Sequence, residues 1–318
     1  MTTMRRRLAQ PSAVIAVVTA LLIPATTAGA QAPHGCGGTA YNPANPDHVL
    51  YGRSAGTMIV DLTGHIAVGG GFVVFWDGTF VPGADGARII GSGHEDVICG
   101  THGDDWIWGK QGRDRIFGFG SANDYDESVP GGDRLGDHLF GGRGDDLITN
   151  GFGVGFAELA AGAALIGGGR GDDTLYSGNG SSGTPTVRGG IGDDTLYGGL
   201  SGSGHVLRGG DGDDSVNLWG LDDSRGFGDA GDDTLTSRWG FNLELSGNTG
   251  DDLLIAGWGD YLTLSGGSGN DTLDAGTGHH QALFGNGGGD VIRGSGAWTG
   301  QVVDGGTGND TITPPLTP

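Results

Sequence analysis

The sequence predicts an all-β protein in which short strands stack into a parallel solenoid. Three observations support this prediction. Glycine accounts for 72 of the 318 residues, far above its usual share of about 7%. A glycine-rich stretch followed by an aspartate and an aliphatic residue recurs from residue 91 onward, and a second apolar residue precedes most of the later aspartates by seven positions. A flexible linker shares the composition but would not keep this register.

Residues 1–30 have the order of a secretory signal peptide. Arg5 to Arg7 form a basic start, residues 13–23 form a short apolar run, and Ala28-Gly29-Ala30 is a small-residue cleavage site. The apolar run is shorter than the ~20 residues that span a bilayer, and no later segment approaches that length. We therefore expect a secreted, extracellular protein without membrane insertion.

Residues 31–90 contain strand-like runs at 57–62, 72–76 and 88–90, but these runs lack the recurring aspartate. A solenoid needs a cap on its exposed end, and we interpret this segment as an N-terminal β cap made of degenerate coils. Cys36 and Cys99 are the two cysteines of the chain. In an oxidising compartment we expect them to form a disulfide, with two free thiols as the alternative.

The recurring pattern is Gly-Gly-x-Gly-Asp/Asn-Asp-x-aliphatic-x, as in residues 189–197. The aliphatic residue lies two positions beyond the aspartate in every copy, so each copy is predicted to end in a short strand that directs one side chain into a core. Twelve aspartates occupy the sixth position: Asp96, Asp105, Asp114, Asp146, Asp173, Asp194, Asp214, Asp233, Asp252, Asp271, Asp290 and Asp310.

The spacing of these aspartates divides the repeats into two regions. In residues 91–149 the first three lie nine residues apart, and residues 118–140 form an insertion. In residues 150–313 the steps from Asp173 onward are 19 to 21 residues, which is close to one whole coil of two strands. Residues 314–318 form a tail. The segment that leads from the second apolar residue to the aspartate keeps one length, so length variation falls in the other bend. We call the bend with the aspartate the motif bend and the other the opposite bend.

The pattern resembles the hemolysin-type calcium-binding repeat, the RTX nonapeptide GGxGxDxUx. The resemblance implies a right-handed parallel β-roll in which six residues of each repeat form a Ca²⁺-binding turn and three form a strand. It also implies that each ion lies between equivalent turns of successive coils. The implied metal ligands are the twelve aspartates, with the backbone of Gly168, Gly171, Gly189, Gly192, Gly209, Gly212, Gly266, Gly269, Gly305 and Gly308.

Calcium prefers oxygen ligands, and glycine lets the backbone adopt the angles that aim carbonyl groups at an ion. We expect the aspartates from Asp173 to Asp310 to form one column on one edge. The stretch from Asp96 to Asp114 could start a second column on the other side. By simple counting, the chain is expected to bind roughly seven to ten ions. Stacked carboxylates repel one another and the core is thin, so the chain is expected to fold on Ca²⁺.

The net charge of −22 makes the chain a poor partner for nucleic acid or anionic lipid. We expect no enzymatic activity and no catalytic residue, and a structural or interaction role with a possible cell-surface or glycan partner. A Ca²⁺-dependent adhesin or surface component is one alternative. Another is a polysaccharide-acting β-helix enzyme, such as a lyase or epimerase. The tryptophans that could stack on sugars are Trp106, Trp108, Trp219, Trp239, Trp258 and Trp298. Their alignment beside a cleft of Arg, His and Asp would favour the enzyme.

Overall fold

The computed structural model describes residues 44, 48–51, 58–62, 73–76, 87–100, 105–118, 137–149, 159–161, 164–182, 184–199, 202–294 and 300–313. These residues form strands, bends and turns. No helix in this part of the chain is long and apolar enough to cross a membrane. Residues 1–30, which are predicted to be a signal peptide, and Cys36 lie outside the described residues.

Two large parallel sheets contain nearly all of the strands. In the order of hydrogen bonding, the thirteen-stranded sheet consists of β1 (His48–Tyr51), β3 (Val73–Trp76), β5 (Val97–Cys99), β7 (Arg115–Phe117), β9 (Leu147–Thr149), β12 (Thr174–Tyr176), β15 (Thr195–Tyr197), β17 (Ser215–Leu218), β19 (Thr234–Ser237), β21 (Leu253–Ile255), β23 (Thr272–Asp274), β25 (Val291–Arg293) and β27 (Thr311–Thr313).

The twelve-stranded sheet faces it and has mostly longer strands. Its order is β2 (Met58–Asp61), β4 (Ala87–Ile90), β6 (Trp106–Gln111), β8 (His138–Arg143), β11 (Leu165–Arg170), β14 (Thr186–Ile191), β16 (Val206–Asp211), β18 (Arg225–Ala230), β20 (Glu244–Thr249), β22 (Thr263–Ser268), β24 (Ala282–Gly287) and β26 (Val302–Asp304). A separate pair is formed by β10 (Leu159–Ala161) and β13 (Asn179–Ser182).

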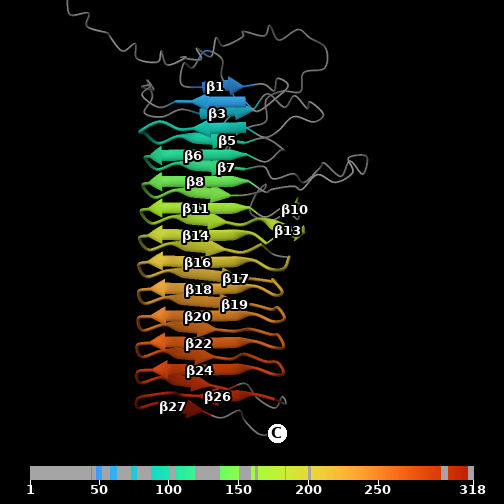
Figure 1. The fold of residues 1–318 in the computed structure, drawn as a ribbon, viewed down its shortest axis with the longest axis vertical. Coiled ribbons are helices and arrows are strands. Elements are labelled where there is room, and N and C mark those ends of the chain that lie inside the picture. Colours follow the sequence, from blue (N-terminus) through green and yellow to red (C-terminus); the bar gives the residue numbers. More distant parts are fainter. Residues whose placement is uncertain are drawn as a thin grey trace, which may run out of the picture.

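The chain alternates between the two large sheets, so every coil contributes one strand to each and successive coils stack in parallel (Figure 1). This arrangement confirms the predicted parallel β-solenoid. The strand-like runs before residue 91 become β2, β3 and β4, which belong to the same two sheets. The segment before the first motif therefore contains coils of the solenoid, and its role as a cap stays a prediction. β8 begins at His138, inside the range predicted for the insertion.

The core is a double row of aliphatic side chains between the sheets. Each coil supplies one from each sheet, such as Leu207 of β16 and Val216 of β17, and both are fully buried. In parallel strands the same position of each coil lies directly over the previous one, so Leu207 continues the row of Val187. Burying such rows stabilises the stack by about 25 cal/mol per Å² of apolar surface.

At one coil a glycine, Gly226, occupies the position of the buried aliphatic residue. An added Cβ there would meet the side chains of Leu218, Val216 and Leu245. Leu218 comes from the end of the preceding strand and is fully buried. The larger neighbour therefore fills the space that the glycine leaves, and the core remains continuous.

Candidate metal-binding column

The sixth-position aspartates of the motif bend form a single continuous column. In each coil the backbone N–H of the aspartate donates to Oδ1 of the aspartate in the following coil, over 2.7 to 3.1 Å. The column contains Asp96, Asp114, Asp146, Asp173, Asp194, Asp214, Asp233, Asp252, Asp271, Asp290 and Asp310. It is longer than the predicted column because Asp96, Asp114 and Asp146 extend it toward the N-terminus.

The second carboxylate oxygen of these residues has a different environment. From Asp114 to Asp290, Oδ2 of every column aspartate is buried and has no hydrogen-bond partner. This oxygen packs against the glycine at the first position of its own repeat: an added Cβ on Gly168 would collide with Oδ2 of Asp173. A buried carboxylate oxygen without a partner is costly. Nine such oxygens in one line indicate a place for a cation.

The environment of the column carboxylates disfavours their charged form. The pKa of Asp114, Asp173 and Asp214 is raised from 3.8 to about 8, mainly by burial. The hydrogen bond from the backbone opposes this rise, and neighbouring carboxylates add to it. A bound divalent cation would supply the missing positive charge.

The glycine at the fourth position of each repeat sets the backbone of the motif bend. From Gly112 to Gly308 this residue has φ between 121° and 145°, a region that only glycine adopts without strain. An added Cβ on Gly231 would also collide with the carbonyl oxygen of Gly212, one coil earlier. The carbonyl group at this position is therefore directed toward the next coil, which makes it a potential ion ligand.

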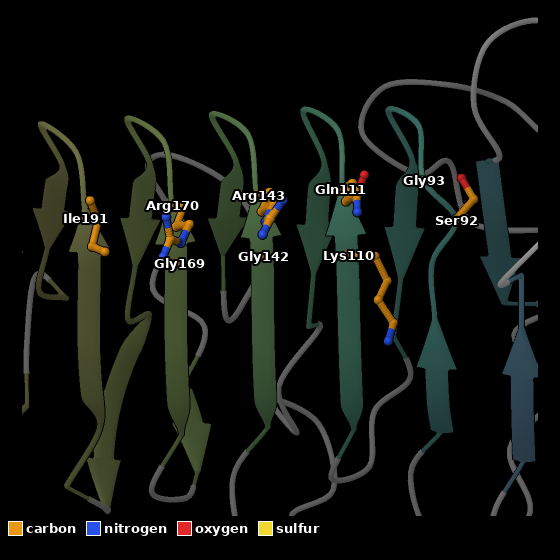
Figure 2. Close-up of a pocket in the computed structure, with 9 residues that line it drawn as sticks. All are labelled: Ser92, Gly93, Lys110, Gln111, Gly142, Arg143, Gly169, Arg170 and Ile191. Atoms are coloured by element: carbon orange, nitrogen blue, oxygen red, sulfur yellow. The ribbon is translucent and has the colours of Figure 1, made fainter.

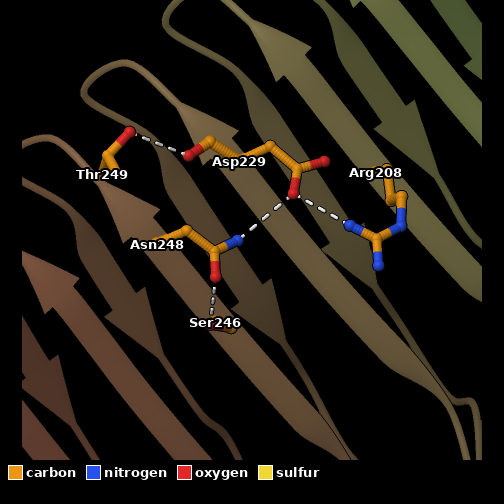
Figure 3. A network of polar contacts seen from close by, with 5 residues as sticks. All are labelled: Arg208, Asp229, Ser246, Asn248 and Thr249. Carbon is orange, nitrogen blue, oxygen red and sulfur yellow. Dashed lines mark hydrogen bonds and ion pairs between the residues drawn. The ribbon is translucent and has the colours of Figure 1, made fainter.

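The second position tolerates a few other residues. Asp229, Asn248 and Asn286 adopt φ of 82°, 78° and 76° there, and Asp and Asn enter this region more readily than most residues. Figure 3 shows that Oδ1 of Asp229 accepts hydrogen bonds from Arg208, at 2.9 Å, and from Asn248, at 3.3 Å. These side-chain bonds connect three successive coils where glycine is missing.

The fifth-position residues form an outer, exposed ladder. Here the N–H donates in the other direction, as from Asp193 to Oδ1 of Asp172 and from Asp213 to Oδ1 of Asp193. The ladder continues to Asn270 and ends where the N–H of Gly289 donates to Asn270. Their exposure and hydrogen bonds suit residues that form the turn.

A second line of aspartates begins on the opposite bend of the N-terminal coils. The N–H of Asp105 donates to Oδ1 of Asp137 at 2.9 Å, and both residues are buried. Asp105 therefore lies on the other edge from Asp96 and Asp114, so the prediction that this stretch starts a second column holds for Asp105 and is wrong for Asp96 and Asp114, which belong to the main column. The sequence reasoning missed Asp137. A usable signal was present, because Asp137 lies nine residues before Asp146 and is followed at the second position by the aliphatic Leu139.

The second column ends after Asp137. The backbone register continues this line through Ala164, Pro185, His205, Ser224, Leu243, Leu262 and Gln281. None of these side chains is a carboxylate, and Leu243 and Leu262 are buried in the core. At these positions the opposite bend thus changes from a line of carboxylates to a line without them, whereas Asp222 and Asp260 occupy other positions of the same bends.

Basic side chains gather on the face beside the N-terminal part of the column. A groove of about 690 Å³ is lined by Lys110, Arg143, Arg170 and Ile191, among others (Figure 2). Its charged lining residues are basic, so it does not suit a cation. In the part of the chain that the structure describes, no three His, Cys, Asp or Glu side chains converge on one point. A calcium site in the described part of the chain would therefore have to combine carboxylates with backbone carbonyls.

Comparison with protein-family models matched the RTX calcium-binding nonapeptide repeat (4 copies). The matched residues are 100–126, 132–156, 165–183, 180–201, 244–260, 263–279 and 295–313. A comparison with curated proteins gave no match. The matched segments include both bends of the N-terminal coils and the motif bend of most later coils, and they confirm the resemblance inferred from the sequence.

Proposed function

The chain carries RTX calcium-binding repeats, and we propose that it is a secreted protein whose solenoid folds on Ca²⁺ and has a structural or interaction role. One observation carries the proposal: the line of buried Oδ2 atoms without hydrogen-bond partners along the motif bend. Without a cation, these carboxylates are desolvated and lie one coil apart, which opposes folding. Cation binding would remove that cost, so binding energy would become folding energy.

The ligands in this proposal come from two successive coils. Carboxylates of the column would supply the charge, and carbonyl groups at the second and fourth positions would complete the oxygen shell. Asp105 and Asp137 offer a shorter second site on the opposite bend. Roughly seven to ten ions stay the expected number for the whole chain. Calcium would neutralise the stacked carboxylates and join each coil to the next.

Three further parts of the proposal concern secretion, a disulfide and catalysis. Residues 1–30 are proposed to direct secretion. Cys36 is proposed to pair with Cys99, which is buried on β5. We also propose that the chain is not an enzyme, because one oxygen of each column carboxylate accepts a backbone N–H and the other would bind the ion.

Calcium removal tests the proposal. The mature chain should lose its β-sheet circular dichroism spectrum in EDTA and regain it in millimolar Ca²⁺, whereas Mg²⁺ at the same concentration should restore less because it demands a tighter octahedral shell. Isothermal titration should give about seven to ten ions per chain. An unchanged spectrum in EDTA, or a stoichiometry of one or two, would contradict the proposal.

A further inference from the structure

The opposite bend exposes a cluster of large aromatic side chains in two successive coils. Trp239 is 49% exposed, Phe241 57%, Trp258 75% and Tyr261 59%. Such surfaces on a folded protein usually mark an interaction site. The other tryptophans differ: Trp106 and Trp108 lie on β6, and Trp219 packs edge-on against Tyr197. Trp298 lies outside the described residues.

The aromatic side chains are mounted on a rigid backbone. Trp239, Trp258 and Thr277 form parallel bridges with one another across successive coils. The N–H of Trp258 donates to the carbonyl of Arg238, and the N–H of Gly240 donates to the carbonyl of Trp258. Leu243 and Leu262 anchor the same bends in the core. The backbone therefore holds Trp239 and Trp258 at equivalent positions of successive coils, one coil apart along the stack.

A groove of about 640 Å³ follows this line and is formed by four consecutive bends. Trp239, Phe241 and Trp258 supply its apolar lining, and Asp222, Asp260 and His279 its ionisable groups. Each aspartate uses Oδ1 to accept an N–H of the next bend: Asp222 accepts the N–H of Phe241, and Asp260 accepts that of His279. These bonds hold one oxygen of each carboxylate, and both residues line the groove with the rings.

The chemistry of this groove favours one class of ligand. A pyranose ring has an apolar C–H face that stacks on an indole and hydroxyl groups that donate to carboxylates. The acidic lining and the net charge of −22 disfavour an anionic polymer. A compact cation would need aromatic rings around it, whereas these rings follow one another along the stack. An elongated ligand fits the line.

We propose that this groove binds a neutral oligosaccharide that lies along the stack and contacts Trp239 and Trp258. The site deepens the proposed interaction role by naming the class of partner, and it depends on calcium only through the fold. Among the described residues the groove lining contains Asp and His but no arginine, and the nearby Arg238 guanidinium lies 5.4 Å from the centroid of the Trp239 ring, where it leaves the other face of that ring for a sugar. The site binds the glycan without cleaving it.

Binding is tested with the full mature chain in saturating Ca²⁺, using cellohexaose and laminarihexaose as neutral probes and a hexamer of galacturonic acid as the anionic one. Titration calorimetry and tryptophan fluorescence should detect a neutral probe and no anionic one. Trp258→Ala and Trp239→Ala should each weaken binding at least about tenfold, because each removes a stacking surface. Asp260→Asn should weaken it by a smaller factor.

Trp106→Ala is the matched control, since Trp106 is 45% exposed but lies on β6, outside the groove. It should leave binding unchanged. The proposal is overturned if neither neutral probe binds, if the anionic probe binds as well, or if Trp106→Ala weakens binding as much as Trp258→Ala. Circular dichroism with and without Ca²⁺ separates this outcome from failure of the proposed function: a chain that still folds on Ca²⁺ but binds no sugar refutes the groove alone.

Discussion

The two bends of each coil solve the same geometric problem in different ways. Both reverse the chain between the sheets, and both use residues with positive φ. In the motif bend the fourth position has φ above 120° and is glycine in every coil from Gly112 to Gly308. In the opposite bend Asp223, Asn242, Tyr261 and His280 have φ between 50° and 60°. This is the ordinary left-handed region, which many side chains can enter at modest cost.

The difference follows from what each bend must place near its neighbours. The motif bend brings a backbone carbonyl and a carboxylate of one coil against the next coil. Neither the side-chain size at its glycines nor its number of residues can therefore vary. The opposite bend has no such line of carboxylates after Asp137. The equivalent positions of the later coils hold residues as different as Pro185 and Leu262. The motif bend is therefore far more restricted in sequence than the opposite bend. The opposite bend is consequently free to carry other chemistry, such as the exposed tryptophans.

The largest effect is expected from removing a carboxylate from the middle of the column. Asp233→Ala deletes the acceptor of the Asp214 N–H and one acid from two neighbouring inter-coil gaps. We expect titration calorimetry to show one or two fewer ions and the Ca²⁺ midpoint of folding to rise about tenfold.

Ser224→Ala is the matched change on the opposite bend, because it deletes the acceptor of the His205 N–H. It should cost about 1 kcal/mol of stability and leave the number of ions unchanged. Equal losses of ions in both variants would break the distinction between the bends.

A smaller effect is expected from placing alanine at positive φ in each bend. Gly231→Ala meets φ of 134° and the carbonyl of Gly212, so it should reduce the free energy of unfolding by about 3 kcal/mol or more. Asn242→Ala meets φ of 56° and should cost about 1 kcal/mol. Urea unfolding in saturating Ca²⁺ measures both. If Asn242→Ala cost as much as Gly231→Ala, the contrast in backbone freedom would be wrong.

The smallest effect concerns acid stability on the opposite bend. His205 is fully buried, its Nδ1 lies 3.0 Å from Oγ of Ser177, and its Nε2 has no hydrogen-bond partner. Burial lowers the pKa of His205 from 6.5 to about 4. Because the unfolded chain binds this proton more readily, the stability from neutral His205 is present above pH 6.5 and lost as the pH falls toward 4.

His205→Gln removes this titration, and glutamine already occurs at the equivalent position as Gln281. Urea unfolding at pH 7 and pH 5 should therefore show a larger loss for the natural chain than for the variant, with a difference on the order of 1–2 kcal/mol. The column carboxylates titrate in both proteins and cancel in the comparison. Parallel pH profiles would show that His205 is not the group responsible.

Much of this architecture could be read from the sequence because a parallel stack repeats the same contacts in every coil. The period of 19 to 21 residues determined the two-strand coil, and the invariant aspartate and glycines determined the motif bend with its column. Twelve aligned copies of the motif show that the sixth position is always aspartate, which a single copy could not show. The aspartates of the column were therefore predicted individually, although their role as calcium ligands stays a prediction.

Only the tertiary structure decided how irregular residues fit into that repeat. It placed Asp105 with Asp137 on one edge and Asp96 with Asp114 on the other, because strand pairing determines which residues become neighbours across the insertion. It showed Leu218 filling the space beside Gly226, since a core contact can come from any residue within reach. It aligned Trp239 with Trp258, because their bends have matching backbone conformations. The sequence by itself determined the contacts that recur in every coil, and the structure decided those that occur once, because only the repeated ones leave a periodic signal.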